Sequence, residues 1–396
     1  MSNHRASTAS TLAPSIAALK TGAENAVSAF RFGDVKLFEL LIGASIAFWR
    51  YPIGGIPGEI LVICAVITVG MFRRAKGTSG NTLLVLGALY FAMIAFVVAV
   101  SILEGASWQQ RTLRLALLAL FALTIAGGRL DWRSIVVGAA VGLAINVGAF
   151  YAGLTPNKYP PFLTGWLMDK NVAGLYYATV GMLLLGVVRR YLLIVIVLAT
   201  AFAFLWLTGS RTSLAAFVLA IGWWLMRNRA PLLLRLGAFL IGVRLLEWFE
   251  ETFSQTGAFA DREGTDILRE SIHAAERAKV TLTPWHGQGL NSAWVDIPNF
   301  PHMWFHDSYA SLFVEGGYPM LWTMLALVGI AGLGLLSRRR VVSDGLRAAE
   351  GALIVALVAA WQLGEVFFTA AVFFALGIAW YERFTAPTER SADLAE

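Results

Sequence analysis

The chain has 396 residues, of which 58% are hydrophobic and only 14% are charged. A soluble globular protein of this size could not bury so much apolar surface, so the composition excludes that class and indicates a membrane protein with several spans. The net charge of +6 does not call for a nucleic-acid partner, because membrane proteins gather Lys and Arg in their cytoplasmic loops.

Residues 1–35 are polar and rich in Ser and Ala, and we expect them to form a cytoplasmic tail. Apolar segments follow, and the predicted fold is an all-α integral membrane protein of about twelve transmembrane helices. The expected spans are 37–49, 56–72, 82–103, 112–126, 134–153, 171–188, 191–207, 212–226, 231–247, 307–336 and a pair from 349–381. The last block exceeds the roughly 20 residues of one span and is divided near Gly364 and Glu365.

This division places helices 1–9 in residues 36–247, a large periplasmic loop in 248–305, helices 10–12 in 306–382 and a cytoplasmic tail in 383–396. The positive-inside rule supports it, because the basic clusters of the short loops then all fall on one side. They are Arg73, Arg74 and Lys76; Arg129 and Arg133; Arg189 and Arg190; Arg227 and Arg229; and Arg338, Arg339, Arg340 and Arg347. Most polar candidate residues fall on the opposite, periplasmic side.

Within the long loop, residues 262–282 have the pattern of an amphipathic helix. Its expected apolar stripe is Ile267, Ser271, Ala274, Ala275 and Ala278, with Arg262, Arg269, His273 and Glu276 near the opposite face. Pro284 ends this helix. The glycine turn that follows, 286–289, is a weak signal for a phosphate-binding loop, because no strand is expected before it.

Three periplasmic side chains are candidates for chemistry. Arg211 lies in a tight turn at the outer start of a span, where it suits bidentate phosphate binding or, alternatively, contact with lipid headgroups. Arg269 lies on the loop helix, where a charged residue is otherwise simply solvated. His306 stands where the polar loop meets a span, as a general base or as a solvated neighbour of a capped helix.

Asp307 is expected to cap the helix that follows His306, and Asp307, Ser311 and Glu315 share one face of that helix. A Glu two turns into a membrane helix is costly, so Glu315 is a functional candidate. Lys170 and Asn171, at the start of another span, offer a cation and backbone N–H groups to an anion, or form an ordinary cap.

No metal or other cofactor is expected. The four histidines of the outer side are His273, His286, His302 and His306, and their spacing matches no metal signature.

Together the motifs of residues 169–322 resemble the O-antigen ligase and polymerase family of bacterial integral-membrane glycosyltransferases. The matching motifs are Asp169-Lys170-Asn171 with Gly174, Ser210-Arg211-Thr212, Arg269 before Pro284-Trp285-His286-Gly287-Gln288-Gly289, His306-Asp307-Ser308-Tyr309, and Glu315-Gly316-Gly317. The earlier spans match only in hydrophobicity. Two positions depart from the family pattern: Tyr318-Pro319 follows the last motif, and His273 stands where an aromatic often follows the loop arginine. The second departure leaves Arg262 open as the alternative to Arg269.

The resemblance implies an enzyme of the bacterial inner membrane. It would transfer a glycan from undecaprenyl diphosphate to an acceptor hydroxyl at the periplasmic face, without a metal. The acceptor would be lipid A-core or a growing glycan. Arg211 and Arg269 would stabilise the diphosphate, assisted by Lys170 and Asn171, and His306 would take the acceptor proton. Asp307 or Glu315 would orient the histidine or hold the acceptor.

A ligase is the working expectation. A polymerase of the same family and a protein O-oligosaccharyltransferase are alternatives that the motifs do not separate. A transporter or lipid flippase is the rival from another class. It would need polar residues near the middle of the bilayer, where Asn146 and Gln362 are the clearest.

Overall fold

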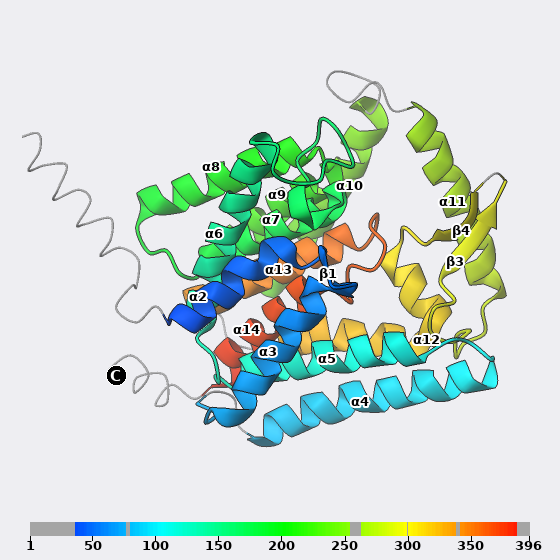
Figure 1. Cartoon of the computed structure of the whole chain (residues 1–396), viewed down its shortest axis with the longest axis horizontal. Coiled ribbons are helices and arrows are strands. Elements are labelled where there is room, and N and C mark those ends of the chain that lie inside the picture. The colour runs from blue at the N-terminus through cyan, green and yellow to red at the C-terminus, as the bar shows by residue number, and fades with distance from the viewer. Residues whose placement is uncertain (1–35, 77–79, 254–262, 299, 338–340, 386–396) are drawn as a thin grey trace, which may run out of the picture.

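The computed structural model describes residues 36–76, 80–253, 263–298, 300–337 and 341–385. In these ranges the chain is mostly helical, with two short antiparallel hairpins (Figure 1). Four segments are long and apolar enough to cross a membrane: α4 (Gly80–Leu103), α6 (Trp132–Tyr151), α8 (Tyr191–Thr208) and Ser308–Gly332. The architecture therefore agrees with an all-α membrane protein, while the count of twelve spans stays a prediction.

Every expected apolar segment contains a helix. The remaining helices of the main body are α2 (Leu37–Ala44), α3 (Gly58–Phe72), α5 (Gln109–Ala126), α7 (Lys170–Leu184), α9 (Arg211–Met226), α10 (Leu232–Phe253), α13 (Asp344–Ala359) and α14 (Ala370–Phe384). The Ser308–Gly332 segment consists of α12 (Ser308–Ala326) and the π-helix η5 (Leu327–Gly332). Short 3-10 turns η2 (Ser45–Phe48) and η3 (Gly165–Leu167) and the hairpin β1 (Pro52–Ile53) and β2 (Ile56–Pro57) complete this body.

Two expected boundaries need correction. Helix α10 continues to Phe253, beyond the expected end of the ninth span at residue 247. Helix α14 continues to Phe384, so Arg383 is part of a helix and is buried instead of opening a polar tail. In both cases a charged residue ends the apolar run in the sequence, but the helical backbone continues past it.

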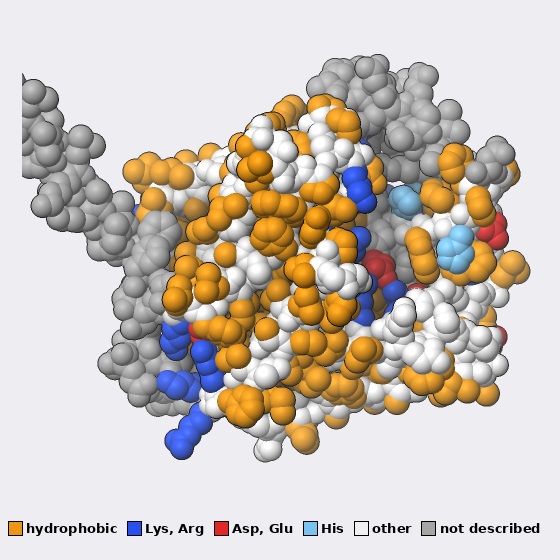
Figure 2. Space-filling model, viewed as in Figure 1, with side chains coloured by type: hydrophobic (Ala, Val, Ile, Leu, Met, Phe, Trp, Pro, Cys, Tyr) orange, Lys and Arg blue, Asp and Glu red, His pale blue; other side chains and the backbone are white. Residues whose placement is uncertain are grey.

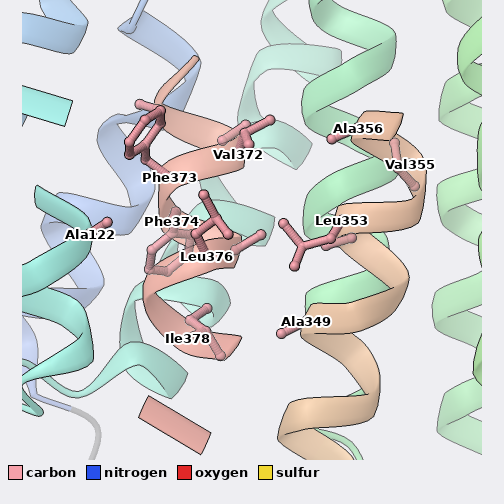
Figure 3. Packing of buried hydrophobic residues seen from close by; sticks show 14 of the residues in the cluster. Ala122, Ala349, Leu353, Val355, Ala356, Val372, Phe373, Phe374, Leu376 and Ile378 are labelled. Atoms are coloured by element: carbon pink, nitrogen blue, oxygen red, sulfur yellow. The ribbon is translucent and has the colours of Figure 1, made fainter. Parts of the chain in front are cut away.

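The core centres on α13 and α14, whose residues are almost all buried. Leu353 of α13 and Leu376 of α14 point toward one another between the two helices, and Ala122 of α5 lies on the far side of α14 (Figure 3). Small residues permit this close packing. A Cβ at Gly377 of α14, for example, would lie 2.8 Å from the backbone oxygen of Ala122.

A lobe beside the main helices is built from α11 (Glu263–Leu282), β3 (Trp294–Ile297) and β4 (Phe300–Trp304) (Figure 1). The hairpin was not predicted. The expected loop helix is confirmed as α11, but its expected apolar stripe is wrong, since Ser271, Ala274 and Ala278 are exposed while Ile272 is buried. Ile272 packs with residues of the hairpin and of α12, and those partners set which face is inward. Arg262 lies outside the described residues, and of Arg269 only the backbone is described.

Candidate functional site

The start of α12 is fixed by the cap that the sequence predicts. The Asp307 side chain accepts hydrogen bonds from the N–H groups of Tyr309 at 2.7 Å and Ala310 at 3.1 Å. Ser308 is buried, and its hydroxyl donates to the carbonyl oxygen of Leu363 at 2.5 Å and accepts from Val366 N–H at 2.9 Å. These bonds join α12 to the α13–α14 turn, residues 360–369.

This turn brings together segments that are far apart in the sequence. Gln362 accepts a hydrogen bond of 2.7 Å from the hydroxyl of Thr212, the neighbour of Arg211. Gly364 lies against the chain before α12, because a Cβ there would be 2.1 Å from the oxygen of Phe305 and 3.8 Å from the Cα of His306. The backbones that carry Arg211 and His306 therefore flank one turn.

The same turn supplies Glu365 to a network of arginines and carboxylates. Arg111 donates through Nε to Glu315 at 2.9 Å and through Nη1 to Glu365. Arg114 donates to Glu365 at 3.1 Å and lies 3.4 Å from Glu59. Glu315 is fully buried, whereas the Glu365 side chain is 37% exposed, so the network runs from the core to the surface.

Glu365 carries a stable negative charge in this network. Burial raises the pKa of its carboxyl, but Arg111 and Arg114 outweigh that effect and lower the pKa to about 2. Since an arginine stays protonated as well, the ion pairs persist across the pH range in which proteins normally work. The two ion pairs of Glu365 are thus a fixed feature of the site.

Sequence analysis missed Arg111 and Arg114. Both lie in the first turns of α5, and they are three residues apart, which puts them on one helix face. The expected span begins at Thr112, so Arg111 falls just outside it and Arg114 falls in its first turn. Like Arg211, both are basic residues on the predicted periplasmic side, where basic residues are rarer.

His306 is held by a group from the lobe. Its backbone N–H donates to Oε1 of Glu276, and the other oxygen of Glu276 lies 2.8 Å from Nδ1 of His273. Glu276 was expected on the wet face of the helix, which is wrong, because its side chain is 3% exposed. A buried carboxylate needs such partners, and the two histidines supply them.

The imidazole of His306 contacts the backbone through one of its two nitrogens. Its Nδ1 lies 3.2 Å from the carbonyl oxygen of Trp304. A carbonyl oxygen only accepts, so in the neutral ring this contact places the proton on Nδ1 and leaves Nε2 to accept one. Next to it, the partly buried Asp307 carboxylate accepts the two N–H bonds of the α12 cap.

The Lys170-Asn171 motif lies beside the start of α9. Asp169 caps α7 by accepting hydrogen bonds from the N–H groups of Asn171 at 2.8 Å and Val172 at 3.0 Å. The motif therefore contains an ordinary helix cap, one of the two expected alternatives. The Asn171 side chain accepts from the hydroxyl of Ser210 at 3.3 Å, so this motif contacts the residue before Arg211. The Lys170 ammonium lies 5.0 Å above the ring of Phe162.

The two glycine motifs, 286–289 and 315–317, pack against each other through their backbones. Helix α12 breaks at Gly316 and Gly317, and Gly317 has φ 62° and ψ −161°. A Cβ at Gly287 would lie 2.6 Å from Gly317 N, and one at Gly317 would lie 1.9 Å from the oxygen of Trp285. The 286–289 turn therefore serves to join the lobe to α12, and Asn291 N–H, just beyond it, donates to Glu315 at 3.2 Å.

Replacing Gly317 with Ala should destabilise the protein by about 3 kcal/mol, because the new Cβ meets a backbone oxygen in a conformation that favours glycine. The measurement is the thermal unfolding midpoint of the purified protein in detergent. Gly222→Ala in α9 is the matched control, since a Cβ there meets nothing within 4 Å. Equal midpoints for the two variants would contradict the close approach.

Figure 2 shows basic and acidic side chains inside a hollow between the main helices and the lobe, with histidine side chains on the lobe side. Among the described residues, no group of three or more His, Cys, Asp or Glu is arranged to hold a metal ion. The chain matches no protein-family model and no curated protein.

Proposed function

We propose that the protein is a glycosyltransferase that moves a glycan from undecaprenyl diphosphate to an acceptor hydroxyl in this hollow. The observation that supports it best is the α13–α14 turn, which contacts the segments of Arg211 and His306 and the side chains of Arg111 and Arg114. Cations and a base thus gather at the ends of apolar helices, where a lipid-borne diphosphate would meet water.

The reaction uses these groups in one displacement. The acceptor oxygen attacks the anomeric carbon, the bond from that carbon to the diphosphate oxygen breaks, and the acceptor proton passes to Nε2 of His306. The diphosphate leaves with an added negative charge, which Arg211 and Arg269 offset, with Lys170 and Asn171 beside them. Attack opposite the leaving group inverts the anomeric centre.

Glu315 takes a different role from the one first expected. Its carboxylate is bound to Arg111 and to the N–H of Asn291, so it holds the arginine network and the lobe together. Glu276 and His273 take over the task of positioning His306. Asp307 acts as the helix cap that sets the direction of α12 beside the histidine.

The two residues that the rival transporter hypothesis singles out have local structural contacts. The side chain of Asn146 binds Tyr177 and the backbone of Thr164 and Trp166, so it holds the chain around η3 in place. Gln362 lies in the α13–α14 turn and not in the middle of a helix. Neither residue marks a polar path across the bundle.

Ligase and polymerase activities are separated by their products. Purified protein in liposomes is given an undecaprenyl-diphosphate-linked glycan together with lipid A-core, or with the lipid-linked glycan alone. Transfer to lipid A-core identifies the ligase, which is our expectation, and elongation of the lipid-linked chain identifies the polymerase. Movement of the intact donor across the membrane without bond cleavage would support the transporter and overturn the proposal.

In the same assay Arg211→Lys should transfer about tenfold to a hundredfold more slowly than wild type. Lysine keeps the charge but loses the fork of donors that binds two phosphate oxygens at once. Arg190→Lys, an exposed position on the predicted opposite side, is the control and should transfer normally. Wild-type rates in Arg211→Lys would rule out bidentate diphosphate binding by this residue.

A further inference from the structure

Glu365 differs from the other carboxylates of its network because solvent can reach it. Its side chain is 37% exposed, whereas those of Glu59 and Glu315 are at most 5% exposed. Burial by the surrounding protein still acts to raise the pKa of the Glu365 carboxyl, so the group is enclosed although it is accessible. A side chain with both properties lies in a concave surface, which agrees with the charged side chains inside the hollow of Figure 2.

The Glu365 carboxylate can accept more hydrogen bonds than the network gives it. An ionised carboxylate has about four lone-pair sites. Glu365 accepts one hydrogen bond from Arg111 at Oε1 and one from Arg114 at Oε2. About two sites therefore remain for hydrogen-bond donors that enter the hollow from solvent.

The backbone at Glu365 has a conformation that glutamate rarely adopts. Its φ is 58°, in the left-handed region that favours glycine. The turn is held on both sides of this residue by Ser308, whose hydroxyl donates to the oxygen of Leu363 at 2.5 Å and accepts from Val366 N–H at 2.9 Å. Strained residues that their surroundings hold in place cluster at functional sites. Here the strain and the two arginines fix the direction of the carboxylate before any ligand binds.

His306 lies close to this carboxylate. A Cβ at Gly364 would be 3.8 Å from the Cα of His306. Because consecutive Cα atoms are 3.8 Å apart, the Cα atoms of Glu365 and His306 are separated by about 9 Å at most. Both side chains are partly exposed, and each extends several ångströms from its backbone. One sugar ring can therefore contact both of them.

The charge of Glu365 selects the part of the substrate that it can bind. A carboxylate accepts hydrogen bonds from hydroxyl groups and repels a diphosphate, which carries charge of the same sign. Arg111 and Arg114 do not reverse this preference, because they already pair with the network's three carboxylates. The acceptor sugar is the better occupant, since His306 is the residue that would take the proton of the attacking hydroxyl.

We propose that Glu365 binds the acceptor sugar by accepting a hydrogen bond from a hydroxyl beside the one that His306 deprotonates. This inference rests on the proposed glycan transfer and assigns its acceptor site. Glu365 takes no proton in the reaction. It holds the sugar ring so that the attacking oxygen faces the anomeric carbon of the donor, and its main contribution is to acceptor affinity.

The first test compares the KM values of the two substrates in the liposome assay, with lipid A-core as the acceptor. Glu365→Gln keeps the shape of the side chain and removes its charge. It should raise the KM for lipid A-core about tenfold and change the KM for the undecaprenyl-diphosphate-linked glycan by less than about twofold. Glu104→Gln removes the same charge at an exposed position directly after α4 and should match wild type. Equal changes in both KM values, or an unchanged KM for the acceptor, would overturn the proposal.

A binding measurement separates this inference from the transfer reaction. Core oligosaccharide released from lipid A, or the glycan released from undecaprenyl diphosphate if that is the acceptor, is titrated into the full-length protein in detergent without donor. Wild type should bind it about tenfold more tightly than Glu365→Gln does. If wild type binds in this way but transfers nothing, the proposed function fails and the Glu365 contact stands. If wild type transfers but the two affinities are equal, the contact alone fails.

A second route applies if Glu365→Gln does not fold. Wild type is then titrated with acceptor oligosaccharides that each lack one hydroxyl beside the attacked position. The analogue that lacks the partner of Glu365 should bind about tenfold more weakly than the intact oligosaccharide. Equal affinity for every analogue would contradict the hydrogen bond.

Discussion

Replacing Arg111 with Met should destabilise the protein by about 3–5 kcal/mol, since breaking a buried ion pair leaves the other charge uncompensated. Glu315 is fully buried, and the variant would leave it with the N–H of Asn291 and without its guanidinium partner. Glu365 would lose one of its two arginines. The measurement is the unfolding midpoint of the purified protein, with the fraction recovered folded from membranes as a second readout.

Arg114→Met is the matched control for this prediction. Arg114 is 23% exposed and its partner Glu365 is 37% exposed, so solvent screens the loss of that ion pair. Its other partner, the buried Glu59, lies 3.4 Å away and keeps a hydrogen bond of 2.9 Å from Ala370 N–H, so the effect should be smaller. The double variant Arg111→Met with Glu315→Gln removes the buried charge together with its partner and should regain part of the lost stability. Similar midpoints for Arg111→Met and Arg114→Met would show that Glu315 does not depend on Arg111.

Replacing His306 with Ala should lower glycan transfer by roughly a hundredfold to ten-thousandfold, the usual contribution of a positioned general base. Folding should change little, because Glu276 binds the backbone N–H of residue 306, which the variant keeps. Transfer is measured in membranes that contain matched amounts of protein. Full activity would remove the general-base role.

The control for His306 is His302→Asn. His302 lies on β4, stacks on Trp294 with ring centroids 4.4 Å apart, and has φ 57°, which asparagine also tolerates. It lies four residues before His306 but takes no part in the proposed displacement, so its variant should transfer normally. A large loss in His302→Asn as well would indicate damage to the lobe and would leave the His306 result without a specific meaning.

Local signals in the sequence predicted much of the fold. Apolar runs predicted the helices of the main body, Asp307 predicted the cap of α12, and Gly364 with Glu365 marked the break between α13 and α14. Each of these features depends on a few consecutive residues and follows from the chemistry of those residues alone. The face of α11 was predicted wrongly because it depends on which element packs against the helix.

The charged networks could not be predicted from residues that are neighbours in the sequence. Arg111 is 204 residues from Glu315 and 254 residues from Glu365, and only the assembled bundle brings them together. Glu350 lies in an apolar run, and Arg227 was used only to assign a loop to the cytoplasmic side. Nothing in the sequence near either residue indicated that they pair across 123 residues. A general clue was available: a carboxylate within an apolar helix requires a cation somewhere in the chain.

The break at Gly316 and Gly317 has a mechanical consequence. The first part of α12 carries Glu315 and adjoins His306, and it is bonded to the lobe through Val314 and Gln288. Ser308 also binds the α13–α14 turn, and Glu315 binds Arg111 of α5, so this part of the helix is held by three separate segments. Contacts ahead of the break therefore fix α12 beside His306, and the direction of the helix beyond Gly317 can differ without moving that end.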